Sequence, residues 1–579
     1  MRHGFLRLAA LPLAIMLFVG CVSLRAQDST TSATGTPGRL YQGKDWSQAD
    51  RADFYSRDQG SRIMPISWFR ALRRADGSLM LDDGLRRYGY LDNPDSPDRL
   101  PVGFTVNGNG STRAIGMTCA ACHTRELEVE GVRYRIDGGP AIVDFQAFLT
   151  DIDLAVGRIL SDPAAFASFA RAVRATDPGM TDDTLLRKEV ALWYLRYHTL
   201  MERALPADGW GLGRLDAVSM IFNRLTGLDL GPAPSFLIAS NIAPADAPVR
   251  YPFIWDAPRQ DHTQWPGFAA NGDNLLALSR NLGEVYGVFG DFMPHKSDRF
   301  LLGYDFVTDN SANFSGLRRL EDLVRRMKAP VWPWAVDANL RSQGQAIFNR
   351  STEDGGCQAC HAERRGTVRF LPPSATWKTP LVDVGTDTRQ YQILARTASS
   401  GAIEGALKPS LGRLKPVDRS IDILATSVIG AILQNDLTLL RGRSIAPKAD
   451  QLGNVLPPVR KELEQAFNVP PATIATDHKY EARVLHGIWS TAPYLHNGSV
   501  PTLRELLTDP AQRVASFDVG AAYDRDSVGL ARTQTGLHQL RRTTGCDRLD
   551  SGNSRCGHKY GTWLSEAEKR ALLEYLKTL

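Results

Sequence analysis

The sequence predicts a mainly α-helical fold of two domains, with short β-hairpins. At 579 residues the chain is too long for one hydrophobic core, so two domains or more are expected. Long amphipathic stretches at 141–174 and 183–204 indicate helices. The pattern Cys-x-x-Cys-His occurs at 119–123 and again at 357–361, and the spacing of 238 residues (357 minus 119) favours one motif per domain.

The sequence divides into four parts. Residues 1–26 have the pattern of an export signal, and residues 27–46, rich in Ser, Thr and Gly, indicate a flexible tether. We expect an N-terminal domain over 47–330 and a C-terminal domain over 331–579. The stretch KAPVWPWAVD, with two prolines and two tryptophans, is the natural boundary between them.

The export signal has two possible ends. Its apolar stretch, which follows two arginines, is too short to span a bilayer comfortably. LFVGC resembles a lipoprotein box, which would place a lipid anchor on Cys21, whereas LRA ending at Ala26 is an ordinary cleavage site. Either way we expect a protein that works outside the cytoplasm, in the periplasm, as a membrane-anchored lipoprotein or secreted, where disulfides persist.

The charge balance excludes one class of partner. The formal net charge is +5, and removal of the export signal leaves about +2 or +3 (5 minus 3, or 5 minus 2). Nucleic-acid binding therefore has no support.

The two Cys-x-x-Cys-His motifs predict two covalently attached haem c groups. Cysteines three apart on one helical turn can each form a thioether with a haem vinyl group, and the following histidine then lies under the iron. A redox dithiol or half of a zinc site is the alternative, but neither requires the histidine. The predicted attachment residues are Cys119, Cys122 and His123 for haem 1 and Cys357, Cys360 and His361 for haem 2.

The remaining cysteines predict a disulfide. Cys21 is lipidated or lost with the signal, which leaves Cys546 and Cys556 as a pair in an oxidising compartment. Their small loop would stabilise the fold by roughly 2–3 kcal/mol. The alternative is two free buried thiols.

Two helices and a hairpin complete the expected elements. LEVEGVRYRI alternates around Glu130-Gly131 and predicts a hairpin directly after the first motif. LRSQGQAIFN predicts a helix before the second motif, and LSEAEKRALLEYLKTL opens with a capping box from Ser565 to Glu568. This order resembles an enlarged class I cytochrome c fold, which implies that its first and last helices pack against each other beside the haem.

The sixth iron ligand decides the chemistry, because a haem with an open position can bind peroxide or dioxygen. All ten methionines lie at or before Met327, so a His/Met pair from the second domain is excluded for haem 2. In the class I layout the sixth ligand precedes the last helix, which favours His558; His496 is the alternative, and a surface role for His558 stays open. The other candidates are a tyrosine, a lysine, a vacancy, or one of His478, His486 and His538.

The segment LHGIWSTAPYLHNGSVPTL resembles the TAPYxHxG stretch of the dihaem cytochrome c peroxidase superfamily, which includes the rubber oxygenases. Peroxidases in this superfamily take a methionine ligand further on, but PTLRELLTDPAQ contains none, which favours the bis-histidine arrangement of the rubber oxygenases. Further stretches that look like the rubber-oxygenase branch are FYSRDQGSRIMPISWF, RIDGGPAIVDFQAF, YPFIWDAPRQDHTQWPGF and GNSRCGHKYGT.

For haem 1 the resemblance implies His123 as proximal ligand and an open distal side. His198, His262, Met117 or another N-domain methionine could instead close the site. Four aromatic residues are candidates for lining a distal pocket or relaying electrons, with ordinary core packing as the alternative: Phe253, Trp255, Trp265 and Phe268.

The sequence thus predicts an exported dihaem c-type redox enzyme. Haem 1 would bind and activate peroxide or dioxygen, and haem 2, on His361 and His558, would relay or store electrons. One alternative is a rubber oxygenase-type dioxygenase that cleaves polyisoprene, a hydrophobic polymer. The other is a non-catalytic dihaem electron carrier. The expected partners are peroxide or dioxygen and an electron-donor protein.

Overall fold

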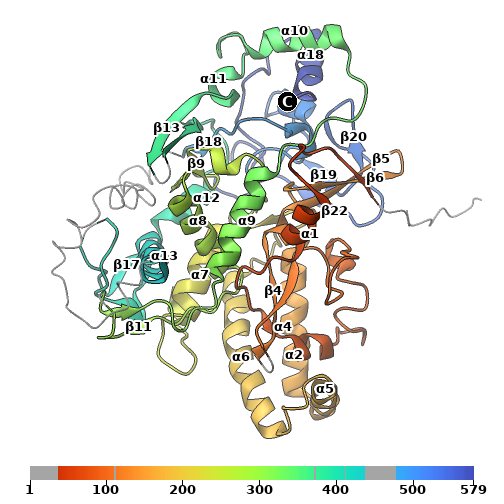
Figure 1. Cartoon of the computed structure of the whole chain (residues 1–579). Coiled ribbons are helices and arrows are strands. Elements are labelled where there is room, and N and C mark those ends of the chain that lie inside the picture. The colour runs from red at the N-terminus through yellow and green to blue at the C-terminus, as the bar shows by residue number, and fades with distance from the viewer. Residues whose placement is uncertain (1–36, 110–111, 301, 371–372, 411, 437–477) are drawn as a thin grey trace, which may run out of the picture. The chain divides into compact units, whose positions relative to one another are not determined.

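Helices outweigh strands in the computed structural model, which describes residues 37–109, 112–300, 302–370, 373–410, 412–436 and 478–579 (Figure 1). The fold is mixed, with 37% helix and 17% strand. Strands are more numerous than the sequence predicts, because many pair over only two residues, too few to show an alternating pattern. The export signal and the lipid anchor at Cys21 lie outside the described residues.

Two small sheets frame the first motif. β5 (Thr124–Val129) and β6 (Val132–Asp137) form the predicted hairpin, and β1 (Gly38–Arg39) adds to β6 in parallel. In the second sheet, β4 (Ala114–Met117) lies between β2 (Met64–Pro65) and β3 (Phe104–Asn107). β4 therefore leads directly into the motif at Cys119, and the hairpin leads away from it.

The part of the predicted tether that the structure describes is packed on the fold. Within 27–46, residues 37–46 pack on the hairpin: the Trp46 indole N–H donates to the Asp137 carboxylate at 2.8 Å, and Leu40 and Trp46 are buried. The prediction of a flexible segment is therefore wrong for 37–46. The composition of 27–46, rich in Ser, Thr and Gly, does not reveal that Leu40 and Trp46 have an apolar surface to pack against.

The amphipathic stretches form the predicted helices. α4 (Phe145–Ser161), α5 (Pro163–Thr176) and α6 (Asp183–Ala204) pack through their apolar faces, and each has an aspartate N-cap. The other described α-helices before residue 330 are α1 (Gln48–Ser56), α2 (Ile66–Ala71), α3 (Cys119–Cys122), α7 (Ala217–Leu228), α8 (Asn274–Gly287) and α9 (Phe314–Arg326).

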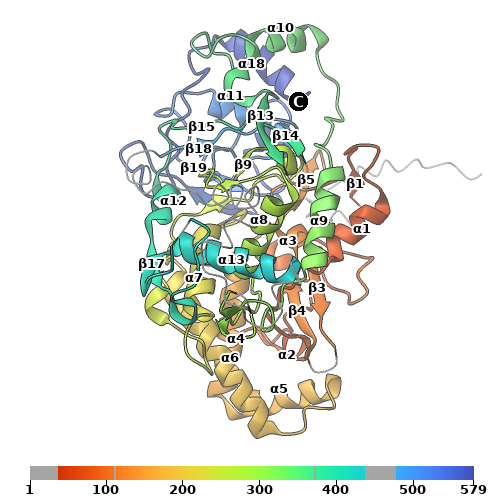
Figure 2. The same cartoon turned by 60° about the vertical axis from the view of Figure 1, so that its left-hand side comes forward.

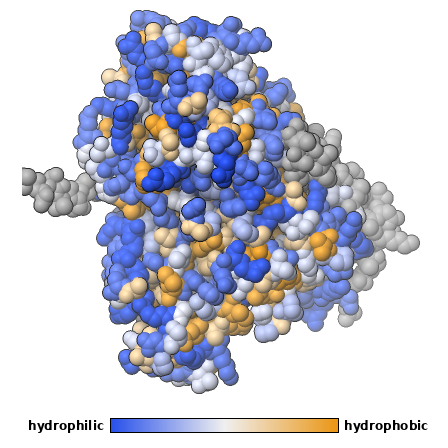
Figure 3. Space-filling model, turned by 180° about the vertical axis from the view of Figure 1, so that it is seen from behind, coloured by the Kyte–Doolittle hydropathy of each residue, from blue (hydrophilic) through white to orange (hydrophobic). Residues whose placement is uncertain are grey.

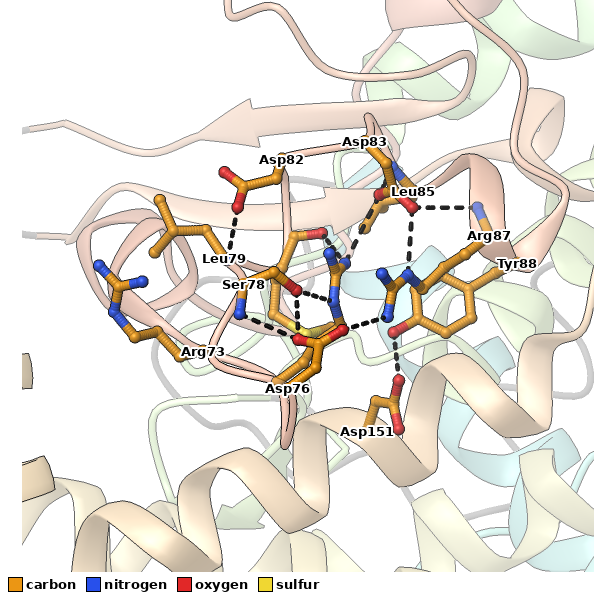
Figure 4. Close-up of polar contacts among 12 residues, drawn as sticks. Arg73, Asp76, Ser78, Leu79, Asp82, Asp83, Leu85, Arg87, Tyr88 and Asp151 are labelled. Atoms are coloured by element: carbon orange, nitrogen blue, oxygen red, sulfur yellow. Dashed lines mark hydrogen bonds and ion pairs between the residues drawn. The ribbon is translucent and has the colours of Figure 1, made fainter. Parts of the chain in front are cut away.

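A turn-rich loop over residues 73–88 is tied down on α4 (Figure 4). The hydroxyl and backbone N–H of Ser78 both donate to the Asp76 carboxylate, which holds the pKa of Asp76 down at about 2. The Tyr88 hydroxyl donates to Asp151 of α4 at 2.6 Å. Two residues further on, Tyr90 is buried in the core cluster on which Cys122 packs. The bond from Tyr88 to Asp151 therefore holds the chain just before a residue that belongs to this cluster.

The first and last helices of the C-terminal part lie side by side (Figures 1 and 2). α10 (Ala338–Phe348) and α18 (Glu566–Leu576) approach so closely that a Cβ on Gly344 would lie 1.9 Å from the Ala571 carbonyl oxygen. The predicted capping box at Ser565 and Glu568 starts α18. The packing implied by the class I resemblance is therefore present.

One long helix, α13, and several short elements make up the rest of the described C-terminal part. α13 (Ser420–Asp436) packs on α7 and α8 (Figure 2). The other helices are α11 (Gln358–His361), α12 (Arg389–Gln392) and α17 (Leu503–Leu506), and the longer strands are β13 (Arg365–Phe370), β14 (Pro373–Trp377), β19 (Ser516–Val519) and β22 (Gln539–Arg542).

The hydrophobic core crosses the expected domain boundary. Met327 and Leu323 belong to the same buried cluster as Trp332, Ile347 and Trp489. Residues 37–579 group into one compact unit by their contacts. The division at residue 330 stays a prediction.

The face seen in Figure 3 is mostly polar. Figure 3 shows a largely hydrophilic face on which hydrophobic residues gather in scattered groups. Among the described residues, no helix combines the length and the apolar character needed to cross a membrane.

Candidate haem sites

The first motif lies on a single helical turn. α3 (Cys119–Cys122) places both cysteines before His123, whose Nδ1 lies 2.9 Å from the Pro252 carbonyl oxygen. A carbonyl only accepts, so Nδ1 carries the hydrogen and Nε2 keeps its lone pair for a metal. Burial lowers the pKa of His123 to about 4, which keeps the ring neutral at pH 7.

Buried phenols surround the first motif. The rings of His123 and Tyr251 meet edge to face at 6.2 Å between centroids. The hydroxyl of Tyr90 is buried and has no hydrogen-bond partner among the described residues, and the buried hydroxyl of Tyr251 lies beside Cys122. A buried hydroxyl without a partner is costly, so a bound group with polar atoms would stabilise this site.

The second motif repeats this local geometry. α11 ends at His361, whose Nδ1 lies 2.8 Å from the Arg483 carbonyl oxygen. Burial lowers the pKa of His361, and the hydrogen bond again leaves Nε2 as the metal-binding nitrogen.

His558 faces His361 across a short gap. The two ring centroids are 6.2 Å apart, and the ring planes differ by 38°. Two imidazoles bound through Nε2 to opposite sides of one metal ion have centroids roughly 6.3 Å apart, since the bonds are about 2.0 Å and the ring centre lies about 1.15 Å from Nε2. The separation is therefore that of an axial pair.

A cavity of about 1300 Å³, open solvent at its mouth included, connects these residues. Its walls include Cys357, Cys360, His361 and His558. Leucines of the segments 485–507 and 572–576 make the remaining wall largely apolar. Both attachment cysteines, two opposed histidines and an apolar lining fit a haem c group.

Three features hold the loop that carries His558. The predicted disulfide joins Cys546 and Cys556. Gly557 has φ +87°, and a Cβ there would lie 2.6 Å from the Thr386 backbone nitrogen, so only glycine allows this approach. The His558 backbone N–H donates to the Val384 carbonyl at 2.8 Å.

Arg513 clamps the same loop from the other side. Its Nη1 donates to the carbonyls of Arg555 and Gly557 at 2.7 and 2.8 Å, and its Nη2 to that of His558 at 3.1 Å. Arg513 is 3% exposed, and burial lowers its pKa to about 10. The guanidinium thus spans the ligand loop through its rigid fork of donors.

The alternative ligand His496 also lines the cavity, but its ring stacks on Tyr480 at 4.0 Å between centroids. Burial lowers the pKa of His496 to about 3. His486 has both ring nitrogens near carboxylates, those of Asp256 and Glu363. His478 meets Tyr391 edge to face, and His538 is exposed. The geometry therefore favours His558.

The candidates for closing the first site have other partners. His198 lies 3.0 Å from Asp153 and stacks on Tyr194, and His262 lies 3.2 Å from Asp261. Met117 is buried in β4, two residues before the motif.

The four aromatic candidates take different places. Phe253 and Trp265 line the second-site cavity. Trp255 stacks on Phe253 at 5.0 Å between centroids, and Phe268 packs on a separate core cluster.

Sequence reasoning missed Pro252, Arg483 and Arg513. The first two act through backbone carbonyls, which every residue has, so no side-chain pattern marks them. Arg513 stands among ordinary surface-type residues in DPAQRVAS, and nothing in that stretch signals burial.

The comparisons with known proteins point to the same region. Residues 479–518 match the family model described as RoxA-like, cytochrome c-like. The match supports a RoxA-like relationship. This segment contains Arg483, His496 and Arg513, so it supplies one wall of the second site. A cytochrome c-like segment implies covalently bound haem c and indicates a haem-type redox protein.

Two relatives of unassigned function come from Sinorhizobium fredii (strain NBRC 101917 / NGR234). The uncharacterized protein y4iJ is 29% identical over 599 residues, which cover 93% of this chain and 92% of that protein. The uncharacterized protein y4iM is 26% identical over 345 residues, 56% of this chain and 63% of that protein.

Proposed function

We propose that the chain is an exported dihaem c-type cytochrome that acts as a redox enzyme. The haem on His123 binds and activates peroxide or dioxygen, and the haem on His361 and His558 stores or relays electrons. The observation that carries the proposal is a difference between the two sites in the histidines near each motif histidine. His558 faces His361 at 6.2 Å, whereas His198 and His262 are paired with aspartates.

The chain's own residues would prepare each haem for its role. Pro252 and Arg483 hold one tautomer of His123 and His361 through their carbonyls. The loop clamped by Arg513 presents His558, and the apolar leucine wall excludes water from that side. The haem itself supplies the electron transfer and, at an open position, the binding of peroxide or dioxygen.

The substrate class and the location belong to the same proposal. The RoxA-like match supports oxidative cleavage of polyisoprene as the special case within peroxide or dioxygen chemistry. The disulfide between Cys546 and Cys556 supports an exported protein, in the periplasm, lipid-anchored through Cys21 or secreted. An electron-donor protein would recharge the second haem.

Haem counting and ligand binding test the proposal. The pyridine haemochrome of purified protein should show two haems per chain, and the double variants C119S/C122S and C357S/C360S should each retain one. Carbon monoxide added to the reduced protein should bind the haem on His123. The C357S/C360S variant should keep that response, and C119S/C122S should lose it.

The electron paramagnetic resonance spectrum separates the enzyme from a carrier. We expect one low-spin haem with two histidine ligands and one haem whose signal changes with peroxide. Two low-spin haems that respond to neither peroxide, dioxygen nor carbon monoxide would establish the electron-carrier alternative instead. Oxidative cleavage of polyisoprene is tested by incubating the protein with polyisoprene latex under dioxygen. Carbonyl-ended fragments in the products would establish the cleavage.

A further inference from the structure

One side chain links the two backbone segments that orient the motif histidines. His361 Nδ1 donates to the backbone carbonyl of Arg483 at 2.8 Å. The guanidinium of the same Arg483 donates through Nη1 to the carbonyl of Phe253 at 2.8 Å. Phe253 directly follows Pro252, whose carbonyl accepts from His123. Three hydrogen bonds and a short run of covalent bonds therefore connect the two imidazoles.

Arg483 is fixed on several sides. Its Nε donates to Gln260 Oε1 at 3.0 Å, and its guanidinium lies over the Phe253 ring at 4.3 Å from the centroid. The carboxylate of Glu481 stands 3.6 Å from Nε, beyond hydrogen-bond length. Arg483 is 5% exposed, so the bridge lies in a low-dielectric interior where its bonds are strong.

The two backbone segments are also paired beside the bridge. The Arg250 N–H donates to the His496 carbonyl at 2.9 Å, and the Trp255 indole N–H donates to the His486 carbonyl at 2.7 Å. A shift of residue 483 that follows a change at His361 therefore moves a guanidinium that is bonded to the segment holding His123. The rigid, planar fork of arginine transmits such a shift better than a flexible side chain.

We propose that Arg483 is a positioning residue that couples the two haem sites, so that the oxidation state of one haem sets the reduction potential and ligand field of the other. This inference rests on the proposed function, because it needs two haems. Coupling between sites is reciprocal, so reduction of either haem should be felt at the other. The side chain would act through the two backbone segments that carry the orienting carbonyls.

A potentiometric titration of the full chain, followed by visible and electron paramagnetic resonance spectra, tests the bridge. In the wild type, reduction of one haem should shift the reduction equilibrium of the other by tenfold or more, about 59 mV for one electron. Arg483→Lys keeps the positive charge, and with it the direct Coulomb effect, but loses the fork. We expect the shift in reduction equilibrium to fall to less than half of the wild-type value. In the half-reduced wild type, the ferric signal of the remaining oxidised haem should change, and in Arg483→Lys this change should be lost.

Two further variants make the test specific. Gln260→Leu removes the acceptor of Arg483 Nε and should weaken the coupling in the same direction, even where Arg483→Lys fails to fold. Arg224→Lys is the matched control: Arg224 is also 5% exposed, lies over the Phe289 ring at 4.9 Å from the centroid and donates to the Gly290 carbonyl, outside both motifs and the His558 loop. Its coupling should equal that of the wild type.

The outcomes are distinct. Unchanged coupling in a folded Arg483→Lys protein with two haems overturns the inference, and so does unchanged coupling in Gln260→Leu where Arg483→Lys does not fold. Equal loss of coupling in Arg224→Lys overturns it as well, because the effect would then be a general loosening of the fold. A haemochrome with one haem per chain instead contradicts the proposed function, whatever Arg483 does.

Discussion

At the first motif, the imidazole of His123 is anchored to the Pro252 carbonyl and surrounded by buried phenols. At the second, His361 is anchored to the Arg483 carbonyl in the same way, but it faces another imidazole. The motif and one carbonyl thus fix the tautomer at both sites. The two sites differ in the residue that faces the motif histidine, which at the second site comes from a distant loop. Under the proposed function, the number of iron ligands would therefore be set by residues outside the motif.

Replacement of His558 by alanine breaks the comparison most strongly. Without that ring, the second haem should lose its sixth ligand and convert from low to high spin, so that both sites become five-coordinate. The visible and electron paramagnetic resonance spectra measure this conversion. His496→Ala is the matched control in the same cavity and should stay low spin; the reverse result would make His496 the ligand.

Glycine substitutions test how the loop brings His558 in. Gly557→Ala should cost about 2–4 kcal/mol of unfolding free energy, from the left-handed backbone and the clash with Thr386. Gly536 also has positive φ (+64°), but nothing lies within 4 Å of its added Cβ. Gly536→Ala should therefore cost only about 1–2 kcal/mol. Denaturant unfolding measures both, and equal losses would show that the close approach is not needed.

The sequence foresaw the motifs, the hairpin, the capped last helix and the disulfide, because each has a local pattern of residue types. It did not foresee that residues 37–46 pack on the hairpin or that many strands pair over two residues. Such contacts depend on what lies opposite in the fold. For the same reason the carbonyls of Pro252 and Arg483 and the clamp of Arg513 had no signal. The second site could be proposed from the sequence mainly because residues 331–579 contain few histidines and no methionine.

A buried carboxylate gives the second site a pH dependence. Asp387 accepts from the Ser554 N–H at 3.0 Å in the His558 loop, and burial raises its pKa to about 6. The folded protein then binds more protons than the unfolded chain between about pH 4 and 6, so the free energy of unfolding falls as pH rises through this window, by about 3 kcal/mol.

Asp387→Asn should reduce the difference in unfolding free energy between pH 4 and pH 7 by about 3 kcal/mol, because its amide oxygen still accepts but does not titrate. Unfolding at pH 4 and at pH 7 measures the difference. Asp547→Asn, an exposed position in the same loop, should keep the wild-type slope. A slope in Asp387→Asn equal to that of the wild type would assign the whole effect to other buried carboxyl groups.

Removal of the disulfide tests the same difference between the two sites and has the smallest expected effect. The double variant C546S/C556S should lose roughly 2–3 kcal/mol of the free energy of local unfolding of this loop, because the opened loop regains the freedom that the disulfide removes. Because Arg513 and the Val384 carbonyl still hold the loop, the second haem should remain low spin at neutral pH. Its spectrum should change earlier in a denaturant titration, while the signal of the first haem keeps its wild-type midpoint. A simultaneous change at both haems would mean that the loop unfolds with the whole core, not as a local clamp.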